Sequence, residues 1–184
     1  MTMMSGARGA RIGAMFAAGL ALAGCVSVPE GVTPVTGFDV ERYMGTWYEI
    51  ARLDHRFERG LTNVTANYQL QDDGSVRVAN RGRSIETGVC DEQIGRATFN
   101  GDPTVASLAV TFFEPFAGGY HVIELAPDYS YAVVSGPTKG YYWILSRTPQ
   151  MNNPTLDRLL GEARANGYPV DSELTLIDQS GPRC

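Results

Sequence analysis

The sequence predicts an all-β fold, an eight-stranded antiparallel up-and-down β-barrel followed by one C-terminal α-helix and a short final strand. Eight short runs rich in β-branched and aromatic residues follow one another, turn-forming residues separate them, and no helical pattern lies between them. Closing such a meander into a barrel removes its exposed strand edges. An immunoglobulin-like sandwich is the competing fold, although it needs longer crossover connections than these tight turns provide.

The eight runs are recognised by alternating apolar and polar residues or by their content of strand-forming residues. They are expected at residues 47–51, 63–70, 75–79, 90–99, 107–113, 120–125, 131–135 and 141–146. The turns between them carry Gly, Pro, Asn or Asp, the residues that favour turn backbones. Such turns are expected at residues 72–74, 100–101, 118–119, 127–128 and 136–137.

One helix is predicted after the barrel. Asn153 is a good N-cap, Pro154 suits the first helical position, and Gly167 ends the helix. Leucine and alanine residues between them form an apolar stripe at helical spacing, which we expect to pack against the barrel wall. A last strand is expected over residues 173–177.

The N-terminal residues 1–24 have the pattern of a signal peptide. Two arginines precede an uncharged apolar run that is too short to span a bilayer as a helix. The run ends in Leu-Ala-Gly-Cys, which resembles the lipobox of bacterial lipoproteins and implies that Cys25 carries the lipid. Residues 25–36 then form a lipidated tether and residues 37–184 the folded domain. An ordinary secretory signal that happens to contain a cysteine is the alternative.

The three cysteines are explained if Cys25 is lipidated, because Cys90 and Cys184 are then left as a pair. Exported proteins meet an oxidising compartment, so these two residues are candidates for one disulfide. The sequence alone does not bring the two sulfurs together, and two free thiols remain the alternative.

The composition is that of an ordinary globular protein of one domain. The 184 residues are 43% hydrophobic and 19% charged, and the net charge is −5. Because no basic stripe is present to neutralise phosphates, the sequence argues against nucleic-acid binding. His55 and His121 lack metal-ligand spacing and are expected at the surface or hydrogen-bonded. No metal or cofactor is expected.

A family resemblance begins at residues 45–48, Gly-Thr-Trp-Tyr, which resemble the Gly-x-Trp-Tyr signature of lipocalins. Residues 38–43 resemble the short 3₁₀ entry of that family. An Asp-Tyr pair resembles the segment before the seventh strand, and an arginine resembles the one that ends the eighth. The resemblance covers residues 36–177 and is strongest to bacterial lipocalins, which resemble animal apolipoprotein D. The signature residues are Gly45, Trp47, Tyr48, Asp128, Tyr129 and Arg147.

The resemblance implies a barrel that is open at one end and closed at the other, where Arg147 crosses Trp47. A guanidinium over an indole gains cation–π attraction, so both residues are assigned structural roles. Alternation indicates which side chains face the interior, although a slip of one residue would invert each assignment. The same residues could also fill a solid core. The expected ligand-binding residues are Val64, Ala66, Tyr68, Val110, Phe112, Ala132, Val134, Tyr141, Trp143 and Leu145.

By this resemblance, the function is to bind, store or transport small hydrophobic ligands such as fatty acids or lysophospholipids. Lipid on Cys25 would hold the domain at a membrane, and the outer membrane is favoured because no aspartate follows Cys25. Two alternatives stay open. A lipocalin-fold enzyme would depend on Cys90 as a nucleophile and would be supported by two free thiols, whereas a structural envelope lipoprotein would have a filled barrel. The sequence favours a binding protein over an enzyme and is compatible with a homodimer.

Overall fold

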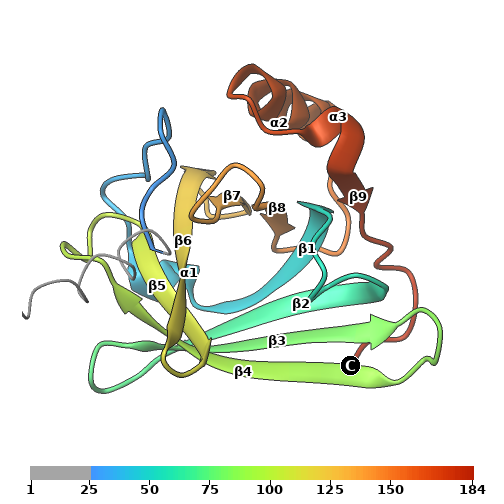
Figure 1. Cartoon of the computed structure of the whole chain (residues 1–184), viewed down its shortest axis with the longest axis horizontal. Helices are drawn as coiled ribbons and strands as arrows, with labels where there is room; N and C mark the ends of the chain where they lie inside the picture. Colours follow the sequence, from blue (N-terminus) through green and yellow to red (C-terminus); the bar gives the residue numbers. More distant parts are fainter. Residues whose placement is uncertain (1–25) are drawn as a thin grey trace, which may run out of the picture.

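The barrel expected from the sequence is confirmed. The computed structural model describes residues 26–184, so the expected signal peptide and Cys25 lie outside the described residues. Eight antiparallel strands pair in chain order, and the first pairs with both the second and the eighth, which closes the ring (Figure 1). The strands are β1 (Gly45–Leu53), β2 (Leu61–Leu70), β3 (Val76–Ser84), β4 (Cys90–Phe99), β5 (Ser107–Phe113), β6 (Phe116–Leu125), β7 (Tyr131–Ser135) and β8 (Tyr142–Ser146).

The remaining elements lie at one end of the barrel and on its outer face. α1 (Val40–Tyr43) begins at the N-cap Asp39 and leads into β1 at the closed end. After β8 the chain forms α2 (Asn153–Ala165), α3 (Val170–Glu173) and β9 (Leu174–Leu176), and β9 pairs with β1. α2 lies beside the barrel (Figure 1). Within residues 26–184, no helix is long and apolar enough to cross a membrane.

Three local expectations differ from the structure. The N-cap of α2 is Asn152 and not Asn153, because Asn152 Oδ1 accepts a hydrogen bond from the backbone N–H of Thr155 at 2.9 Å. The short helix α3 takes the place of the residues expected to begin the final strand, so that strand is shorter than residues 173–177. The entry to β1 is one turn of α-helix instead of a 3₁₀ turn.

The turn expected at residues 118–119 is wrong. β6 begins at Phe116 and runs through both glycines, and the reversal from β5 lies at Glu114-Pro115. A Cβ at position 119 would stand 2.6 Å from Nε2 of His121 and 3.3 Å from the backbone of Val26. The glycine therefore marks a close approach of other groups to the strand and not a turn.

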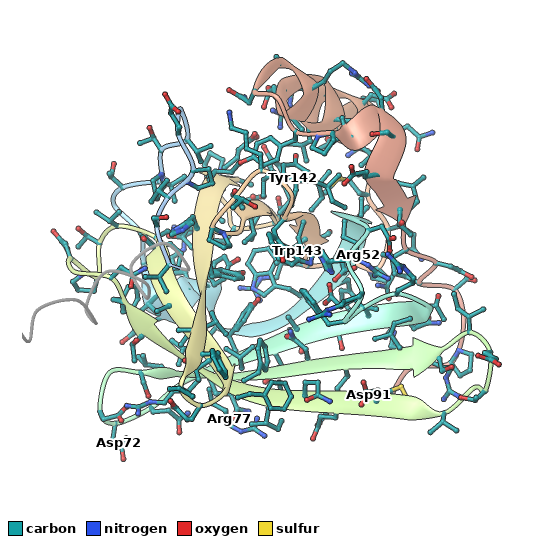
Figure 2. The ribbon with its side chains drawn as sticks, viewed as in Figure 1. Arg52, Asp72, Arg77, Asp91, Tyr142 and Trp143 are labelled. Atoms are coloured by element: carbon teal, nitrogen blue, oxygen red, sulfur yellow. A yellow bond between two sulfur atoms is a disulfide. The ribbon has the colours of Figure 1, made fainter. Side chains whose placement is uncertain are left out.

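Alternation along β8 separates two hydrophobic layers. Trp143 and Leu145 point into the barrel, whereas Tyr142 and Ile144 point outward and pack under α2. The Tyr142 hydroxyl donates to the backbone carbonyl of Leu159 in that helix at 3.4 Å (Figure 2). Because burying a large apolar side chain stabilises by roughly 1.5–3 kcal/mol, the outer layer fixes the helix firmly to the barrel.

Arg147 and Trp47 seal the closed end, as the resemblance implied. The guanidinium carbon of Arg147 lies 3.9 Å from the centre of the Trp47 ring. Arg147 also donates hydrogen bonds to the carbonyls of Thr46 at 3.1 Å and Arg42 at 2.7 Å. Trp47 Nε1 donates to the carbonyl of Tyr43 at 2.9 Å. These contacts fasten α1 and the start of β1 to the end of β8.

Other signature residues act at the same end. Gly45 has a φ of +94°, a left-handed conformation that favours glycine, and a Cβ there would lie 3.5 Å from Nη1 of Arg147. The Tyr129 hydroxyl accepts a hydrogen bond from the backbone N–H of Asp39 at 2.9 Å. Asp128 stabilises the turn before β7 by accepting a backbone N–H at 3.0 Å. Five of the six signature residues thus contribute contacts at the closed end, whereas the Tyr48 ring lies 4.9 Å from the guanidinium carbon of Arg183.

The segment expected as a tether lies partly against the barrel. The N–H of Val35 donates to the carbonyl of Val122 at 2.9 Å, and the carbonyl of Val35 accepts from the N–H of Ala106 at 3.0 Å. Thr36 forms an isolated bridge with Val105. The last part of the segment therefore runs between β6 and the start of β5.

The expected disulfide is confirmed. Cys90 at the start of β4 is bonded to Cys184 in the segment that follows β9. The bond ties this segment, which crosses the outside of the barrel, to the open end of β4 (Figure 1).

Removing the Arg147 side chain is expected to weaken the closed end. Arg147→Leu loses the cation–π contact and leaves two carbonyls without their donor, so we expect the free energy of unfolding in urea to fall by about 1–3 kcal/mol. Arg96→Leu is the matched control, because it removes an exposed ion pair with Asp73 and should cost about 1 kcal/mol or less. Equal losses in the two variants would contradict the special role of Arg147.

Breaking the disulfide is expected to destabilise the fold. Cys184→Ser opens a covalent loop whose ends are 94 residues apart, which corresponds to about 4 kcal/mol in the chain-entropy description. Urea denaturation of the variant and of the reduced wild-type protein should give the same lowered midpoint. A midpoint equal to that of the oxidised wild-type protein would show that the bond contributes nothing.

Candidate ligand-binding site

Most of the ten residues expected to line the barrel lie on its interior side. Eight of them belong to the interior hydrophobic cluster or pack against it. Val64 lies beside Gly82 of β3, and Tyr141 lies just before β8 at the open end. Their role in binding a ligand stays a prediction. The eight clustered residues are Ala66, Tyr68, Val110, Phe112, Ala132, Val134, Trp143 and Leu145.

The open end lies opposite α1, where the strands reverse through four loops. These loops are residues 54–60, 85–89, 114–115 and 136–141. β5 pairs with residues 96–99 of β4, so the first half of β4 continues past β5 toward the open end. Figure 1 shows β3 and β4 running side by side to the loop that joins them at this end.

One part of the interior wall is apolar and partly accessible. Val110 and Phe112 of β5 and Trp143 of β8 face inward but are only half-buried, so they present apolar surface inside the barrel. The ring of Phe112 lies over the backbone of Gly95 in β4. A wall of this kind can hold an aliphatic chain through apolar contact.

A charged network lies beside Trp143, and the sequence analysis did not find it. A β-bulge in β1 between Glu49 and Ala51 shifts the alternation of inward and outward residues. Glu49 is paired with Leu145 and Arg52 with Trp143, and both of these partners point into the barrel. Both charged residues therefore face the interior, which regular alternation along a strand forbids. A bulge leaves no signal in the sequence of β1 that could have revealed this.

Arg52 is the centre of this network and is only 2% exposed. Its Nη1 donates to Glu49 Oε1 at 2.5 Å, and its Nη2 donates to the backbone carbonyl of Glu58 at 2.5 Å. The carboxylate of Glu58 accepts from Nε1 of Trp143 at 3.0 Å and lies 3.3 Å from Nδ1 of His55. The loop between β1 and β2 is thereby fastened to the inside of the barrel mouth, where Figure 2 places Arg52 and Trp143.

Burial controls the protonation of this network. Burial, with the charge of Glu58, raises the pKa of Glu49 to about 8, and burial also raises the pKa of Glu58. The single guanidinium of Arg52 balances one carboxylate, so a second buried negative charge is unfavourable. Burial and the Arg52 charge lower the pKa of His55 to about 4, which keeps its ring neutral at neutral pH. The network is thus close to neutral in total charge.

The two histidines have different surroundings. His121 is buried and hydrogen-bonded as expected, between a serine hydroxyl of β5 at 3.0 Å and the carbonyl of Ser27 at 3.1 Å. For His55 the expectation is wrong, because its ring is buried and, within residues 26–184, makes no hydrogen bond; its Nδ1 only lies near the Glu58 carboxylate. Its ring instead stacks on Phe57 at 4.2 Å and on Tyr141 at 5.6 Å. These rings form an aromatic edge to the open end.

Three tyrosine hydroxyls form a polar floor in the barrel. Tyr120 shares hydrogen bonds with Tyr43 at 2.7 Å and with Tyr68 at 2.9 Å. Burial raises the pKa of all three hydroxyls, so they stay neutral and act only as hydrogen-bonding groups. Tyr68 therefore belongs to this floor, beside the contact between Tyr43 and Trp47.

The described part of the chain bears on two alternatives, a metal site and catalysis by Cys90. It holds no group of three or more His, Cys, Asp or Glu side chains that could bind a metal ion. Cys90, on which the enzyme alternative depended, is bonded to Cys184. In this form it presents no thiolate to act as a nucleophile.

Comparison with known proteins agrees with this architecture. The family described as a lipocalin-like domain matches residues 38–178. The chain belongs to the lipocalin family. This lipocalin is 50% identical over 153 residues to outer membrane lipoprotein Blc of Escherichia coli (strain K12), an alignment that covers 83% of this chain and 86% of that relative.

More distant relatives share the same barrel. Apolipoprotein D of Mus musculus is 32% identical over 151 residues, which cover 78% of each chain. The solved structure of insecticyanin from the tobacco hornworm Manduca sexta superposes with a TM-score of 0.66 at 22% identity, covering 86% of this chain and 89% of that one. The predicted family and fold of this lipocalin are confirmed, and its similarity to outer membrane lipoproteins confirms the predicted location at the outer membrane.

Neutralising Glu49 is expected to change how stability depends on pH. Because its pKa is raised from 4.5 to about 8 in the folded protein, Glu49 contributes stability that is fully present below about pH 4.5 and is lost as the pH rises to about 8. Glu49→Gln keeps an oxygen acceptor for Arg52 but removes the titration. The melting temperature of the variant should therefore fall less than that of the wild type between about pH 5 and about pH 8.

The control for this measurement is Glu86→Gln, an exposed carboxyl in the loop between β3 and β4. Its melting curve should follow the wild type over the same pH range. Parallel curves for the wild type and Glu49→Gln would mean that Glu49 keeps an ordinary pKa in the folded protein.

Proposed function

We propose that this lipocalin binds one small hydrophobic ligand with an aliphatic chain, such as a fatty acid or a lysophospholipid, inside the open end of the barrel. The observation that carries this proposal is the half-buried inward wall formed by Val110, Phe112 and Trp143. Eight-stranded barrels are wide enough to hold one small ligand. Membership of the lipocalin family supports the same kind of ligand.

Burial of the chain would supply the affinity. Each buried methylene contributes about 0.8 kcal/mol. A chain that buries about ten methylenes therefore gains enough to offset the several kcal/mol of translational and conformational freedom lost on binding. The hydroxyls of Tyr43, Tyr68 and Tyr120 already bond one another at the floor, so the chain would end above them.

The polar end of the ligand would stay near water. Asp91 and Gln93 of β4 are paired with residues of β3 that face the interior. Asp91 and Gln93 are nevertheless exposed, so solvent reaches this part of the mouth. The guanidinium of Arg52 is already paired with Glu49 and held by the Glu58 carbonyl. We therefore place the headgroup at the β3–β4 side of the mouth and the chain against the apolar wall.

The cell envelope is the setting of this proposal. Removal of residues 1–24 would leave Cys25 as the first residue, with its lipid, ahead of residues 25–36 and the domain of residues 37–184. Lipoprotein anchors with two or more acyl chains hold a protein stably to a membrane. A carrier fixed in this way works beside the membrane where lipid ligands are found.

The test is a titration of the purified, delipidated protein with a fluorescent long-chain fatty acid, followed by displacement with a lysophospholipid. Phe112→Ser places a hydroxyl in the apolar wall and should weaken binding roughly ten-fold. Phe113→Ser is the matched control, because the neighbouring phenylalanine is 70% exposed, and it should leave the affinity unchanged.

Saturable binding to one site, weakened by the first substitution alone, supports the proposal. Absence of saturable binding by correctly folded protein would refute the lipid-carrier function and favour a structural role in the envelope. Equal effects of the two substitutions would place the ligand outside the barrel.

A further inference from the structure

Large exposed apolar side chains are concentrated on the loops of the open end. Of the eight such side chains in the described part of the chain, five lie on or beside these loops, and the other three are Leu70, Ile94 and Leu176 in separate strands. A soluble surface seldom groups exposed apolar residues in this way unless the surface binds something. The five, which we call the apolar rim, are Phe57 (60% exposed), Ile85 (70%), Val89 (64%), Phe113 (70%) and Phe116 (72%).

The apolar rim is made by three separate strand reversals. Phe57 lies between β1 and β2, Ile85 and Val89 lie between β3 and β4, and Phe113 and Phe116 flank the reversal between β5 and β6. In an up-and-down barrel these reversals share one end. The rim therefore lies around the mouth proposed above for ligand entry, and its side chains are exposed to solvent.

The N-terminal chain approaches the same end. The carbonyl of Ser27 lies 3.1 Å from Nε2 of His121, and the backbone of Val26 lies 3.3 Å from where a Cβ of Gly119 would stand. Traced from Ser27 back to Val26, the chain thus runs along the outer face of β6 from His121 toward Phe116. Gly119 is three residues from Phe116, about 10 Å along a strand. Cys25 directly precedes Val26 in the sequence.

Charge does not explain the apolar rim. Arg56 and the carboxyl residues Glu86 and Glu114 are all exposed at the open end, so both signs are present. Arg59 is paired with Asp54 at 2.5 Å. A partner recognised by charge would meet a mixed field here, whereas a lipid surface would accept the aromatic and aliphatic side chains into its interfacial layer.

We propose that the apolar rim inserts into the surface of the membrane that holds the anchor, so that the barrel mouth faces the bilayer. This orientation rests on the proposed lipid on Cys25, because the described chain from Ser27 to Val26 runs toward the rim. A flat bilayer can receive three separated loop tips at once, whereas a second protein copy would need a continuous complementary surface. The ligand would then pass between bilayer and barrel without crossing bulk water.

The experiment uses the mature acylated protein in phosphatidylethanolamine and phosphatidylglycerol vesicles whose acyl chains carry bromine, which quenches tryptophan fluorescence on contact. Phe116→Trp places a reporter on the rim, and Leu70→Trp places one at the end of β2 on the closed side. The signal of the parent protein, from Trp47 and Trp143, is subtracted. We expect at least two-fold quenching of the reporter at position 116 and none at position 70.

Other outcomes overturn the orientation. No quenching at position 116, or equal quenching at both positions, would mean that the mouth does not face the bilayer. A different outcome would assign the rim to a second copy of the chain. In that outcome the tryptophan at position 116 becomes more shielded from water as the protein concentration rises in unbrominated vesicles, and brominated lipid does not quench it. Mass spectrometry of the same sample shows separately whether Cys25 carries lipid. For protein without that lipid, quenching of the tryptophan at position 116 by added brominated vesicles still measures insertion of the rim.

A rim variant separates this inference from ligand binding. Replacing Phe113 and Phe116 with serine should abolish quenching of a tryptophan placed at Val89, and the fluorescent fatty-acid affinity in solution should stay within about two-fold of wild type. Retained quenching in this variant would count against the apolar rim. In the Phe116→Trp protein, quenching by brominated lipid without saturable fatty-acid binding would count against the proposed function and not against the apolar rim.

Discussion

The barrel depends on β1, because this strand pairs with both β2 and β8 and so closes the ring. Its first half pairs with β2 and its second half with β8, while β9 pairs with it near the open end. A regular strand would have to bend sharply to serve these partners, and the bulge after Glu49 supplies the bend because an extra residue increases local twist and curvature. At its start, β1 is held by the contact between Trp47 and Arg147, so one strand connects the sealed floor to the open mouth.

The same bulge determines the chemistry of the interior. By shifting the alternation, it turns Glu49 and Arg52 toward the barrel axis, where neither can be solvated. Buried charges must be paired, and the partners come from the following loop through Glu58 and from β8 through Trp143. The interior is therefore divided into a charged and aromatic side at β1 and β8, an apolar side at β5, and a floor of tyrosine hydroxyls. The proposed site for an aliphatic chain is the half-buried apolar wall that this division leaves.

Sequence reasoning succeeds where local pattern alone sets the structure. The strands at residues 90–99, 107–113 and 131–135 are found with their observed bounds, and the facing of Val110, Phe112 and Trp143 follows from regular alternation. It fails where distant segments meet. The glycines at 118–119 are predicted to form a turn, because the sequence does not reveal that the folded chain brings Val26 against β6 at Gly119. The charged network is missed because a bulge is a response to strand pairing and has no fixed signature in the strand itself.

The charged network also has a physical cost that its position makes understandable. An arginine buried with two carboxyl groups is often no more stable than apolar side chains of similar volume, so stability alone does not account for it. Its hydrogen bonds, however, are directional and reach both the backbone of the loop and the side chain of Trp143. Apolar packing would cover the same volume without fixing where the loop lies. Within that loop the His55 ring stacks on Phe57, and it also packs at a tilt against Trp143 of β8. The network therefore sets the position of an apolar side chain at the rim together with the wall inside the mouth.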